Sequence, residues 1–361
     1  MPELPEVETV RRGLQKLIIG KQIVAETHDT DKSFPNEANE VAEFLLGTTV
    51  TNVRRRAKVL LIDLSSNYTL ITHLKMTGQL VFVGEKRGVR SSELGDGAGA
   101  SEAELRFGAG HPNESLIGNL PDKSTRVIIY FGFSRKGDPH EVHARKDRSA
   151  QVAVDMPLLV SPGVADTATS LKRWQSFGIY PGAGQRDGCL FFNDQRKFGW
   201  MRLLPTISVP EIDFMKRVGP EPLEDDFTAK VLYERLQRRK NTSIKAALLD
   251  QTVLAGIGNI YADESLWGAK IHPATLVRDI PAASIFILHS EILSVLRLSL
   301  AKGGSTDRNY VNAEGKKGSY IDFARVFRRE GQPCPRCDTT IEKIRVAGRG
   351  THVCPNCQKL T

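Results

Sequence analysis

The sequence predicts a multidomain α+β protein, and three features of the chain lead to this class. A helical pattern opens the chain and is followed by short strands separated by polar or glycine-bearing turns, as in an antiparallel sandwich or barrel. Further helical patterns follow a proline-rich linker, and two closely spaced cysteine pairs end the chain. A length of 361 residues has room for two or three domains with buried cores.

The first helix is predicted from Pro5 to Ile18, because apolar residues recur at helical spacing from Val7 to Leu17 and proline suits a first helical turn. The strands that follow are short and rich in Val, Ile, Leu and Phe. They are predicted at residues 58–64, 68–74, 79–83, 126–133, 189–193 and 200–204. Cys189 lies within such a pattern and is expected to be a core residue.

Two long stretches interrupt the strand pattern. Residues 84–122 contain GDGAGA and scattered Gly, Ser and Glu, and residues 134–187 are mixed in character. Structureless loops of this length are uncommon inside compact domains, so both stretches are interpreted as insertions. Their structure and role stay open at the level of sequence.

The second half of the chain is predicted to be helical after a linker at residues 205–226, which is rich in proline and acidic residues. Asp226 and Ser243 are expected N-caps, and Gly303-Gly304 is an expected helix stop. The helices are predicted at residues 226–239, 243–254, 259–267 and 281–302.

Composition excludes several classes of protein. With 40% hydrophobic and 25% charged residues the chain is neither disordered nor fibrous. No apolar run approaches the ~20 residues that span a bilayer, and the N-terminus has no apolar signal core, so we expect a cytoplasmic protein with no membrane partner. The net charge is +8, and residues 302–361 hold 12 basic against 6 acidic residues, which favours a polyanionic partner near the C-terminus.

The cysteine pairs predict a metal site. Each Cys-x2-Cys pair can present two thiolates from a tight turn, and two such pairs complete a closed tetrahedral Zn²⁺ shell. The four residues are Cys334, Cys337, Cys354 and Cys357. No open coordination position is visible, so we expect one structural Zn²⁺ ion per chain. The basic segment between the pairs, which includes Arg349, could contact phosphate.

The N-terminus has the chemistry of a nucleophile. Removal of Met1 leaves Pro2 as a secondary amine, and an α-amino group has a pKa near ~7.7–8, so that part of it is neutral at working pH. Its condensation with a sugar aldehyde gives a cationic iminium, which is an electron sink for elimination. Glu3 and Glu6 place acid–base groups beside it. Further on, a Gly256-x-Gly258 turn leads into a helix whose free N–H groups could bind phosphate, or it is an ordinary helix connection.

The N-terminal string PELPEVETVR resembles that of bacterial formamidopyrimidine-DNA glycosylases, which excise 8-oxoguanine and ring-opened purines. The resemblance recurs in order along the chain and covers everything except the two insertions. The matching motifs are RAK at 56–58, HLKMTG at 73–78, DQRKFG at 194–199, GPEPL at 219–223, GIGNIYADES at 256–265, GGS at 303–305 and the four cysteines.

The resemblance implies three domains. They are an N-terminal β-sandwich catalytic domain at 1–208 that carries the insertions, a helix-two-turns-helix DNA-binding domain at 219–325, and a C-terminal zinc-finger hairpin at 326–361. Residues 303–318 correspond to the loop that closes over an extruded base.

The resemblance also implies catalytic roles. The Pro2 amine attacks C1′ of the damaged nucleotide, and the resulting Schiff base undergoes β- and δ-elimination. Glu3 matches the general acid that protonates the deoxyribose ring oxygen, and Glu6 a neighbour that orients the terminus or the flipped base. Lys58 and Arg349 match residues that hold phosphates around the lesion.

Further DNA contacts follow from the same resemblance. Because the damaged base must be flipped out of the duplex, other side chains must fill the gap, and Met76, Arg196 and Phe198 match the residues that do so. Asn259 matches a phosphate contact, and Lys245 is expected to contribute nearby. Damaged double-stranded DNA is therefore the expected partner, bound by a monomer.

Two alternatives remain open. An endonuclease VIII-like enzyme for oxidised pyrimidines typically has Gly in place of Leu4, so this N-terminus favours the purine enzyme. A non-enzymatic zinc-hairpin protein would bind DNA without cleaving it. The exact lesion and the preferred opposite base are not defined by the sequence.

Overall fold

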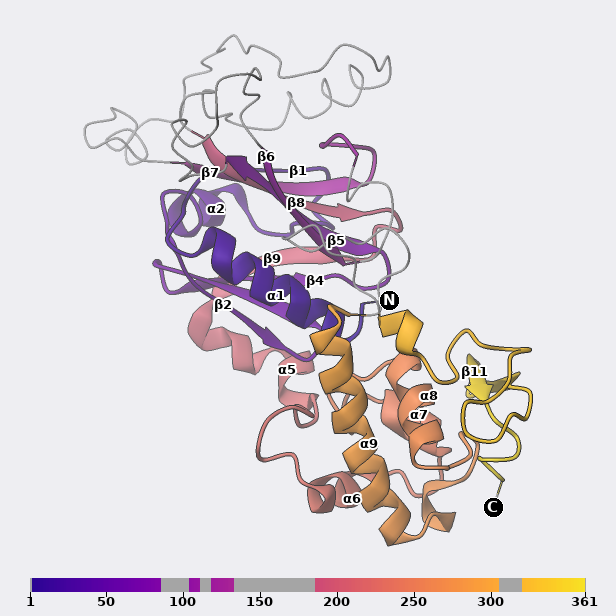
Figure 1. Ribbon diagram of the computed structural model, residues 1–361. Helices are drawn as coiled ribbons and strands as arrows, with labels where there is room; N and C mark the ends of the chain where they lie inside the picture. Colours follow the sequence, from indigo (N-terminus) through magenta and orange to yellow (C-terminus); the bar gives the residue numbers. More distant parts are fainter. Residues whose placement is uncertain (1, 86–103, 111–117, 133–185, 305–319, 361) are drawn as a thin grey trace, which may run out of the picture.

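The structure, a computed structural model, describes residues 2–85, 104–110, 118–132, 186–304 and 320–360 (Figure 1). Almost all of the predicted insertion 134–187 lies outside these residues. The same holds for the predicted base-closing loop 303–318, of which only Gly303 and Gly304 are described.

Two antiparallel sheets form the N-terminal half, as the sequence predicted. One sheet has the strand order β1-β7-β8-β5-β6, and the other has the order β2-β3-β4-β9. The strands of the first sheet are β1 (Gln22–His28), β5 (Gly78–Glu85), β6 (Glu104–Gly110), β7 (Thr125–Gly132) and β8 (Arg186–Asp194). Those of the second are β2 (Val50–Arg56), β3 (Val59–Leu64), β4 (Tyr68–His73) and β9 (Trp200–Pro205).

Helix α1 (Leu4–Ile18) joins the sheets in one apolar core, because Val7, Val10 and Leu14 on its inner face are fully buried there. Its acidic first turn and proline start suit the positive end of a helix. Gly13 lets the ring of Phe107 approach this helix, since a Cβ at Gly13 would lie 2.0 Å from that ring.

Strand β3 is buried on both faces, which explains the apolar run from Val59 to Ile62. Leu60 and Ile62 of β3 belong to the core between the sheets. Leu61 packs on the opposite face against the short helices η3 (Thr206–Glu211) and α5 (Asp213–Arg217). The first part of the predicted linker 205–226 is therefore a cover for the second sheet, and the prediction of a bare linker was wrong there.

Three strands were missed. In β1 buried residues alternate with partly exposed polar ones, and β2 ends in three arginines, so neither has the apolar density of its neighbours. Strand β6 lies inside the predicted insertion 84–122 and pairs with β5, so part of this stretch belongs to the first sheet. Its sequence ELRFGAG is short and rich in glycine, and pairing along β5 stabilises it despite a weak local preference.

The helical half consists of α6 (Ala229–Gln237), α7 (Ile244–Leu249), α8 (Asn259–Gly268) and α9 (Ala282–Ala301) with the short η4 (Val277–Asp279) and η5 (Tyr320–Phe323), whereas α2 (Ala38–Phe44) belongs to the N-terminal half. Ser243 precedes α7 as predicted, whereas Thr228 rather than Asp226 caps α6 by accepting from the Val231 N–H at 3.3 Å. Gly303 and Gly304 end α9 with positive φ angles of 76° and 92°.

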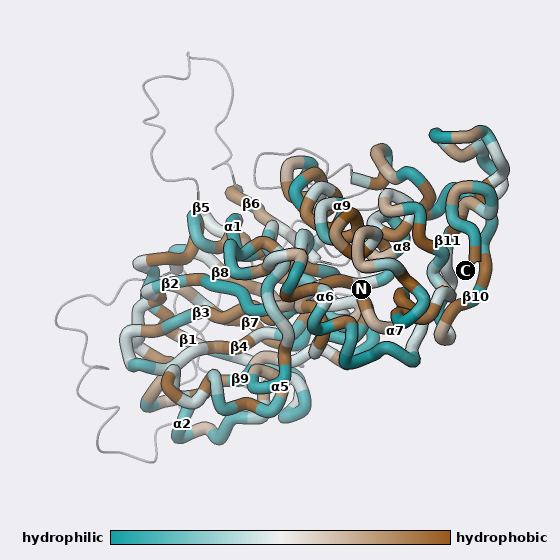
Figure 2. The backbone as a smooth tube through the Cα atoms, turned by 90° about the horizontal axis from the view of Figure 1, so that it is seen from below, coloured by the Kyte–Doolittle hydropathy of each residue, from teal (hydrophilic) through white to brown (hydrophobic). Residues whose placement is uncertain are grey.

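Helix α9, at 20 residues, is long and apolar enough by length and composition to cross a membrane, so the expectation that no apolar run reaches this length does not hold. A core helix passes the same test. Ile285, Leu288 and Ile292 of α9 are buried in the core of the helical half. Figure 2 shows hydrophobic segments along α9 and along the strands of both sheets.

Two isoleucines test this layering. Ile62 is 1% exposed between the sheets, and Ile207 on η3 is 87% exposed. Ile62→Ala should lower the free energy of unfolding by about 2–5 kcal/mol, because it removes buried methyl groups and leaves a cavity, whereas Ile207→Ala should change it by less than about 0.5 kcal/mol. Urea denaturation of both variants gives the comparison, and equal losses would contradict the assigned core.

Candidate active site and nucleic-acid interface

Pro2 lies buried just before α1, where the sandwich meets the helical half (Figure 1). The Leu4 N–H donates to the carbonyl of Gly256 at 3.0 Å, and the Glu3 N–H donates to Glu6 Oε2 at 2.8 Å. These bonds fix the backbone directly after Pro2, so the position of the terminus is set by both halves of the molecule.

The Gly256-x-Gly258 turn makes this close approach possible. Gly256 has a φ of +80°, and a Cβ there would lie 2.6 Å from the Leu4 side chain. A Cβ on Gly258 would lie 2.3 Å from the carboxyl carbon of Glu3. The turn thus serves as the surface against which the N-terminal segment packs.

Glu3 is 3% exposed, and its carboxyl group receives a hydrogen bond from the Ile260 N–H at 3.1 Å, at the start of α8. Its second oxygen, Oε2, is buried without a hydrogen-bond partner among the described residues. Burial raises the pKa of Glu3 from 4.5 to about 7, an effect that the Lys58 ammonium opposes and Glu6 reinforces. A carboxyl group with such a pKa can hold a proton near neutral pH and donate it as a general acid.

Lys58 directly precedes β3 and follows Ala57, whose φ of 52° lies in the turn of the β2–β3 hairpin. Its Nζ donates to the carbonyl of Ile257 at 2.7 Å, and its side chain is buried, as is that of Glu3. Burial lowers the pKa of Lys58, while Glu3 and Glu6 act in the opposite direction and Arg349 lowers it further. Arg349, from the zinc hairpin, is thus close enough to influence the pKa of Lys58.

Glu221 holds the hairpin that carries Lys58. Its carboxylate is buried and accepts from the Ala57 N–H at 2.5 Å, from Arg55 at 2.7 Å and from Arg56 at 2.9 Å. Because Glu221 lies in the segment that connects the two halves, this cluster joins the hairpin to that connection.

Residues of the helical half orient the Glu6 side chain. The Tyr261 hydroxyl on α8 donates to Glu6 Oε1 at 2.6 Å and also lies 2.6 Å from the Ser299 hydroxyl on α9. Burial raises the pKa of Tyr261, with Glu6 adding to the effect, so the phenol remains a hydrogen-bond donor. Glu6 therefore connects α1, α8 and α9 beside the N-terminus.

The structure brings the three predicted gap-filling residues together at the surface. Met76 is 38% exposed and Phe198 is 46% exposed, which is unusual for large apolar side chains. The Arg196 guanidinium lies 4.9 Å from the Phe198 ring centroid, and its Nη1 lies 3.1 Å from the sulfur of Met76. Two loops far apart in sequence thus bring together two apolar side chains and one planar, cationic side chain.

Two predicted phosphate contacts lie at chain turns. Asn259 is the first residue of α8, and its Oδ1 is buried without a hydrogen-bond partner among the described residues. Arg349 is exposed at the tip of the hairpin formed by β10 (Glu342–Val346) and β11 (Arg349–Val353), next to the positive-φ residues Ala347 and Gly348. Both positions suit contacts to an extended anionic backbone.

Lys245 occupies a different environment from the other predicted DNA contacts. Its side chain is fully buried, and its Nζ donates to Asp263 at 2.6 Å, to Thr351 at 2.7 Å and to the carbonyl of Gly350 at 3.2 Å. This geometry places Lys245 in the contact between α7, α8 and the zinc hairpin and does not support a direct contact with DNA.

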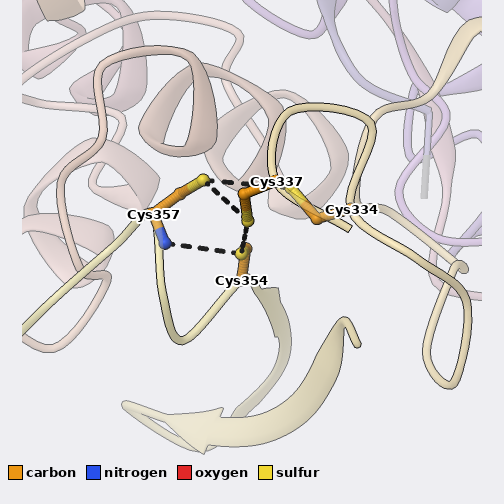
Figure 3. A group of neighbouring side chains, drawn as sticks. All are labelled: Cys334, Cys337, Cys354 and Cys357. Atoms are coloured by element: carbon orange, nitrogen blue, oxygen red, sulfur yellow. Dashed lines mark hydrogen bonds between the residues drawn. The ribbon is translucent and has the colours of Figure 1, made fainter. Parts of the chain in front are cut away.

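The four predicted cysteines converge at the base of the hairpin (Figure 3). Their sulfur atoms all lie within 4.8 Å of one another, and three of the separations are 3.4, 3.5 and 3.9 Å. A tetrahedron with Zn–S bonds of about 2.3 Å has edges of about 3.8 Å, so the set fits one Zn²⁺ ion and leaves no open position.

The zinc finger is tied to α8. Trp267 donates to the sulfur of Cys334 at 3.4 Å, and the Arg336 guanidinium lies 3.9 Å from the Trp267 ring. Glu264, also on α8, accepts N–H bonds of 2.8, 2.9 and 2.8 Å from the consecutive residues Arg325, Val326 and Phe327. These contacts fix the zinc finger relative to α8.

These features define a DNA-binding protein with a zinc finger and a buried, chemically competent N-terminus. Three family models match the chain: the formamidopyrimidine-DNA glycosylase N-terminal domain at residues 1–132, the formamidopyrimidine-DNA glycosylase H2TH domain at 218–310, and the zinc finger found in FPG and IleRS at 331–360.

Relatives match over the whole chain. The formamidopyrimidine-DNA glycosylase of Pediococcus pentosaceus is 35% identical over 360 residues, covering 100% of both chains, and that of Streptococcus mutans is 34% identical over 361 residues, covering 99% and 100%. The chain belongs to the formamidopyrimidine-DNA glycosylase family, the base-excision repair glycosylases that act on damaged DNA.

Solved structures agree with this assignment. A complex between Lactococcus lactis Fpg and DNA containing an abasic site has a TM-score of 0.69 at 30% identity, covering 99% of both chains. MutM in complex with DNA containing carbocyclic 8-oxo-G has a TM-score of 0.68 at 29% identity, covering 99% of this chain and 100% of that one. The predicted family, fold class and structural zinc ion are confirmed.

Sequence reasoning assigned no role to Tyr261, Ser299 or Glu221. Tyr261 and Glu221 lie inside the quoted motifs, so their position was known, but their partners come from distant segments. Only the fold brings these partners together, and no local pattern could have indicated them.

The pKa of Glu3 predicts a pH dependence of stability. A folded-state pKa of about 7 against an ordinary value of 4.5 means that folding favours the protonated form. This contribution is complete below the unfolded value and is lost as the pH rises through the folded value. Glu3→Gln should remove that part of the dependence, measured as the free energy of unfolding between about pH 4 and 8, a range that spans both values.

Glu224→Gln provides the control for the loss of one carboxyl group, because Glu224 is exposed. It should retain the wild-type dependence on pH. A Glu3→Gln variant with the same pH slope as wild type would contradict the raised pKa.

Proposed function

We propose that this enzyme excises oxidised purines, namely 8-oxoguanine and formamidopyrimidines, from duplex DNA and then cleaves the strand at the abasic site through a Schiff base on Pro2. The buried Pro2 next to Glu3, whose pKa lies near 7, is the observation that carries the proposal. The DNA complexes of similar solved proteins, with abasic-site and 8-oxo-G DNA, support the choice of substrate.

In the first step the Pro2 nitrogen attacks C1′, and the base departs with the electron pair of the glycosidic bond and takes up the proton that the Pro2 nitrogen releases. Glu3 donates its proton to the ring oxygen as the C1′–O4′ bond breaks, which gives an iminium between Pro2 and C1′. Burial favours the protonated carboxyl that this step requires.

The iminium then withdraws electrons during elimination. Loss of a C2′ proton expels the 3′ phosphate, and a further proton loss from C4′ expels the 5′ phosphate. Two cationic side chains are suited to hold phosphates on either side of the reacting sugar. They are Lys58, which is buried and donates to the Ile257 carbonyl, and Arg349 at the hairpin tip.

The damaged nucleotide must leave the base stack for this chemistry. Met76, Arg196 and Phe198 form a contiguous exposed group that could enter the vacated space and face the orphaned base. Asn259 at the start of α8 would contact the backbone beside the lesion.

One copy of the chain carries every group that the proposal uses, so a monomer suffices. We propose the domain limits 1–208, 219–325 and 326–361 for the catalytic sandwich, the helical module and the zinc finger. A place in the cytoplasm, in association with chromosomal DNA, follows from this substrate.

Borohydride trapping tests the proposal. Wild-type protein should form a covalent adduct with a duplex containing 8-oxoguanine, and Pro2→Gly should reduce adduct formation by about 100-fold or more, because the secondary amine is lost. Pro210→Gly, which alters an exposed proline on η3, is the matched control and should trap like wild type.

The substrate class is tested on a panel of lesions. Cleavage of thymine glycol DNA with none of 8-oxoguanine DNA would favour the pyrimidine enzyme. Tight binding of damaged DNA without any adduct would exclude the Schiff-base mechanism and favour a non-enzymatic DNA-binding protein.

A further inference from the structure

The three exposed residues Met76, Arg196 and Phe198 lie on two loops, one between β4 and β5 (residues 74–77) and one between β8 and β9 (residues 195–199). Left-handed backbone occurs in both loops, with φ angles of 52° at Lys75 and 56° at Lys197. Such conformations cost free energy for residues other than glycine, so something must hold the loops in this shape.

The carboxylate of Asp194 is the common partner of both loops. It is fully buried at the end of β8 and accepts the N–H groups of Phe198 at 2.8 Å and Gly199 at 2.6 Å through Oδ2. Through Oδ1 it accepts the hydroxyl of Thr77, from the first loop, and the N–H of Arg196 at 3.2 Å.

Thr77 completes the connection. Its hydroxyl oxygen also accepts the Arg196 N–H at 3.1 Å, so one residue next to Met76 contacts both the backbone of Arg196 and the carboxylate. Arg196 and Phe198 are therefore attached to a single buried side chain through their own N–H groups, and Met76 through the hydroxyl of the adjacent Thr77.

The backbone of Asp194 is itself held in place. Its N–H donates to the carbonyl of Ser124 at 2.7 Å, and its carbonyl accepts from Arg126 at 2.8 Å. Gly199 leaves room for this arrangement, because a Cβ there would lie 2.6 Å from Phe192 and 3.2 Å from Asp194 Oδ2. The core thus fixes the position of the Asp194 carboxylate, and the hydrogen bonds of this carboxylate fix the two surface loops.

We propose that Asp194 is a positioning residue that pre-assembles Met76, Arg196 and Phe198 for insertion into DNA, and that it thereby governs base extrusion and discrimination of the opposite base. The inference rests on the proposed function. It assigns to Asp194 no contact with DNA and no part in bond breaking, which belong to the buried N-terminal site.

Asp194→Asn tests this role, because an amide keeps the size of the side chain but replaces one acceptor oxygen by a donor that faces N–H and O–H groups. Excision of 8-oxoguanine in single turnover should fall by about tenfold or more. Trapping on a preformed abasic site should change less than about threefold, because no damaged base must then be released and the N-terminal site is intact. The preference between C and A opposite the lesion should weaken.

Asp122→Asn is the matched control. Asp122 is also a turn carboxylate that accepts a backbone N–H and a hydroxyl, both from Ser124, but it contacts neither loop. It should leave excision, trapping and opposite-base preference as in wild type. Thr77→Val removes the hydrogen bond between the first loop and the carboxylate of Asp194. It should shift the opposite-base preference in the direction expected for Asp194→Asn, and it provides the test if Asp194→Asn folds poorly.

Wild-type behaviour of both Asp194→Asn and Thr77→Val would overturn the proposal. Equal losses of excision and abasic-site trapping would also overturn it, since they would place the effect on the catalytic centre or on folding. Failure of the proposed function is distinguishable, because wild-type protein itself would then form no adduct with either DNA.

Discussion

The packing of the N-terminal segment against the glycine turn before α8 is the interaction on which the rest of the site depends. Gly256 and Gly258 let the first residues of the chain lie in a buried position that any side chain at those points would block. Burial there costs free energy for charged groups, and it is this cost that raises the pKa of Glu3 to about 7 and lowers that of Lys58. The same contact determines the location of Pro2, the proposed nucleophile, and the protonation of Glu3, the proposed acid, because both pack on one surface.

Buried carboxylates organise the structure around this contact. Glu221 accepts hydrogen bonds from the hairpin that carries Lys58, Glu264 accepts them from the start of the zinc finger, and Asp194 accepts them from the two surface loops. In each case backbone N–H groups from a loop converge on a carboxylate that is held by a strand, a helix or the connection between the two halves. Charge-assisted hydrogen bonds of this kind are short and strong, and leaving such a group unpaired in the interior is costly, so each loop has one favoured shape. Side chains that are proposed to contact DNA thus lie on the surface, while buried carboxylates fix the backbone of the loops that carry them.

Much of this organisation could be predicted from sequence, and the limits have physical reasons. The first helix, six strands, the four helices and the cysteine site have strong local patterns. The N-terminal string indicated Pro2 and Glu3 as site residues, and the RAK motif at 56–58 added Lys58 through the resemblance to the family. Strand β6 was missed because its stability comes from pairing with β5 and from Phe107 against Gly13, and both are tertiary contacts. Lys245 was expected to face DNA because its position near the helical motif is all that sequence gives, whereas its burial depends on Asp263 and Thr351, 18 and 106 residues away.

A single methyl group tests the central claim that glycine packing creates the active N-terminus. In Gly258→Ala the new Cβ would lie 2.3 Å from the carboxyl carbon of Glu3, so the N-terminal segment must move while the zinc finger and the surface loops are untouched. The decisive measurement is borohydride trapping on abasic-site DNA beside the affinity for the same DNA without borohydride. We expect trapping to fall by about tenfold or more while affinity changes less than about threefold, since misplacement of a nucleophile by about 1 Å is costly in rate. Wild-type trapping by Gly258→Ala would contradict the account.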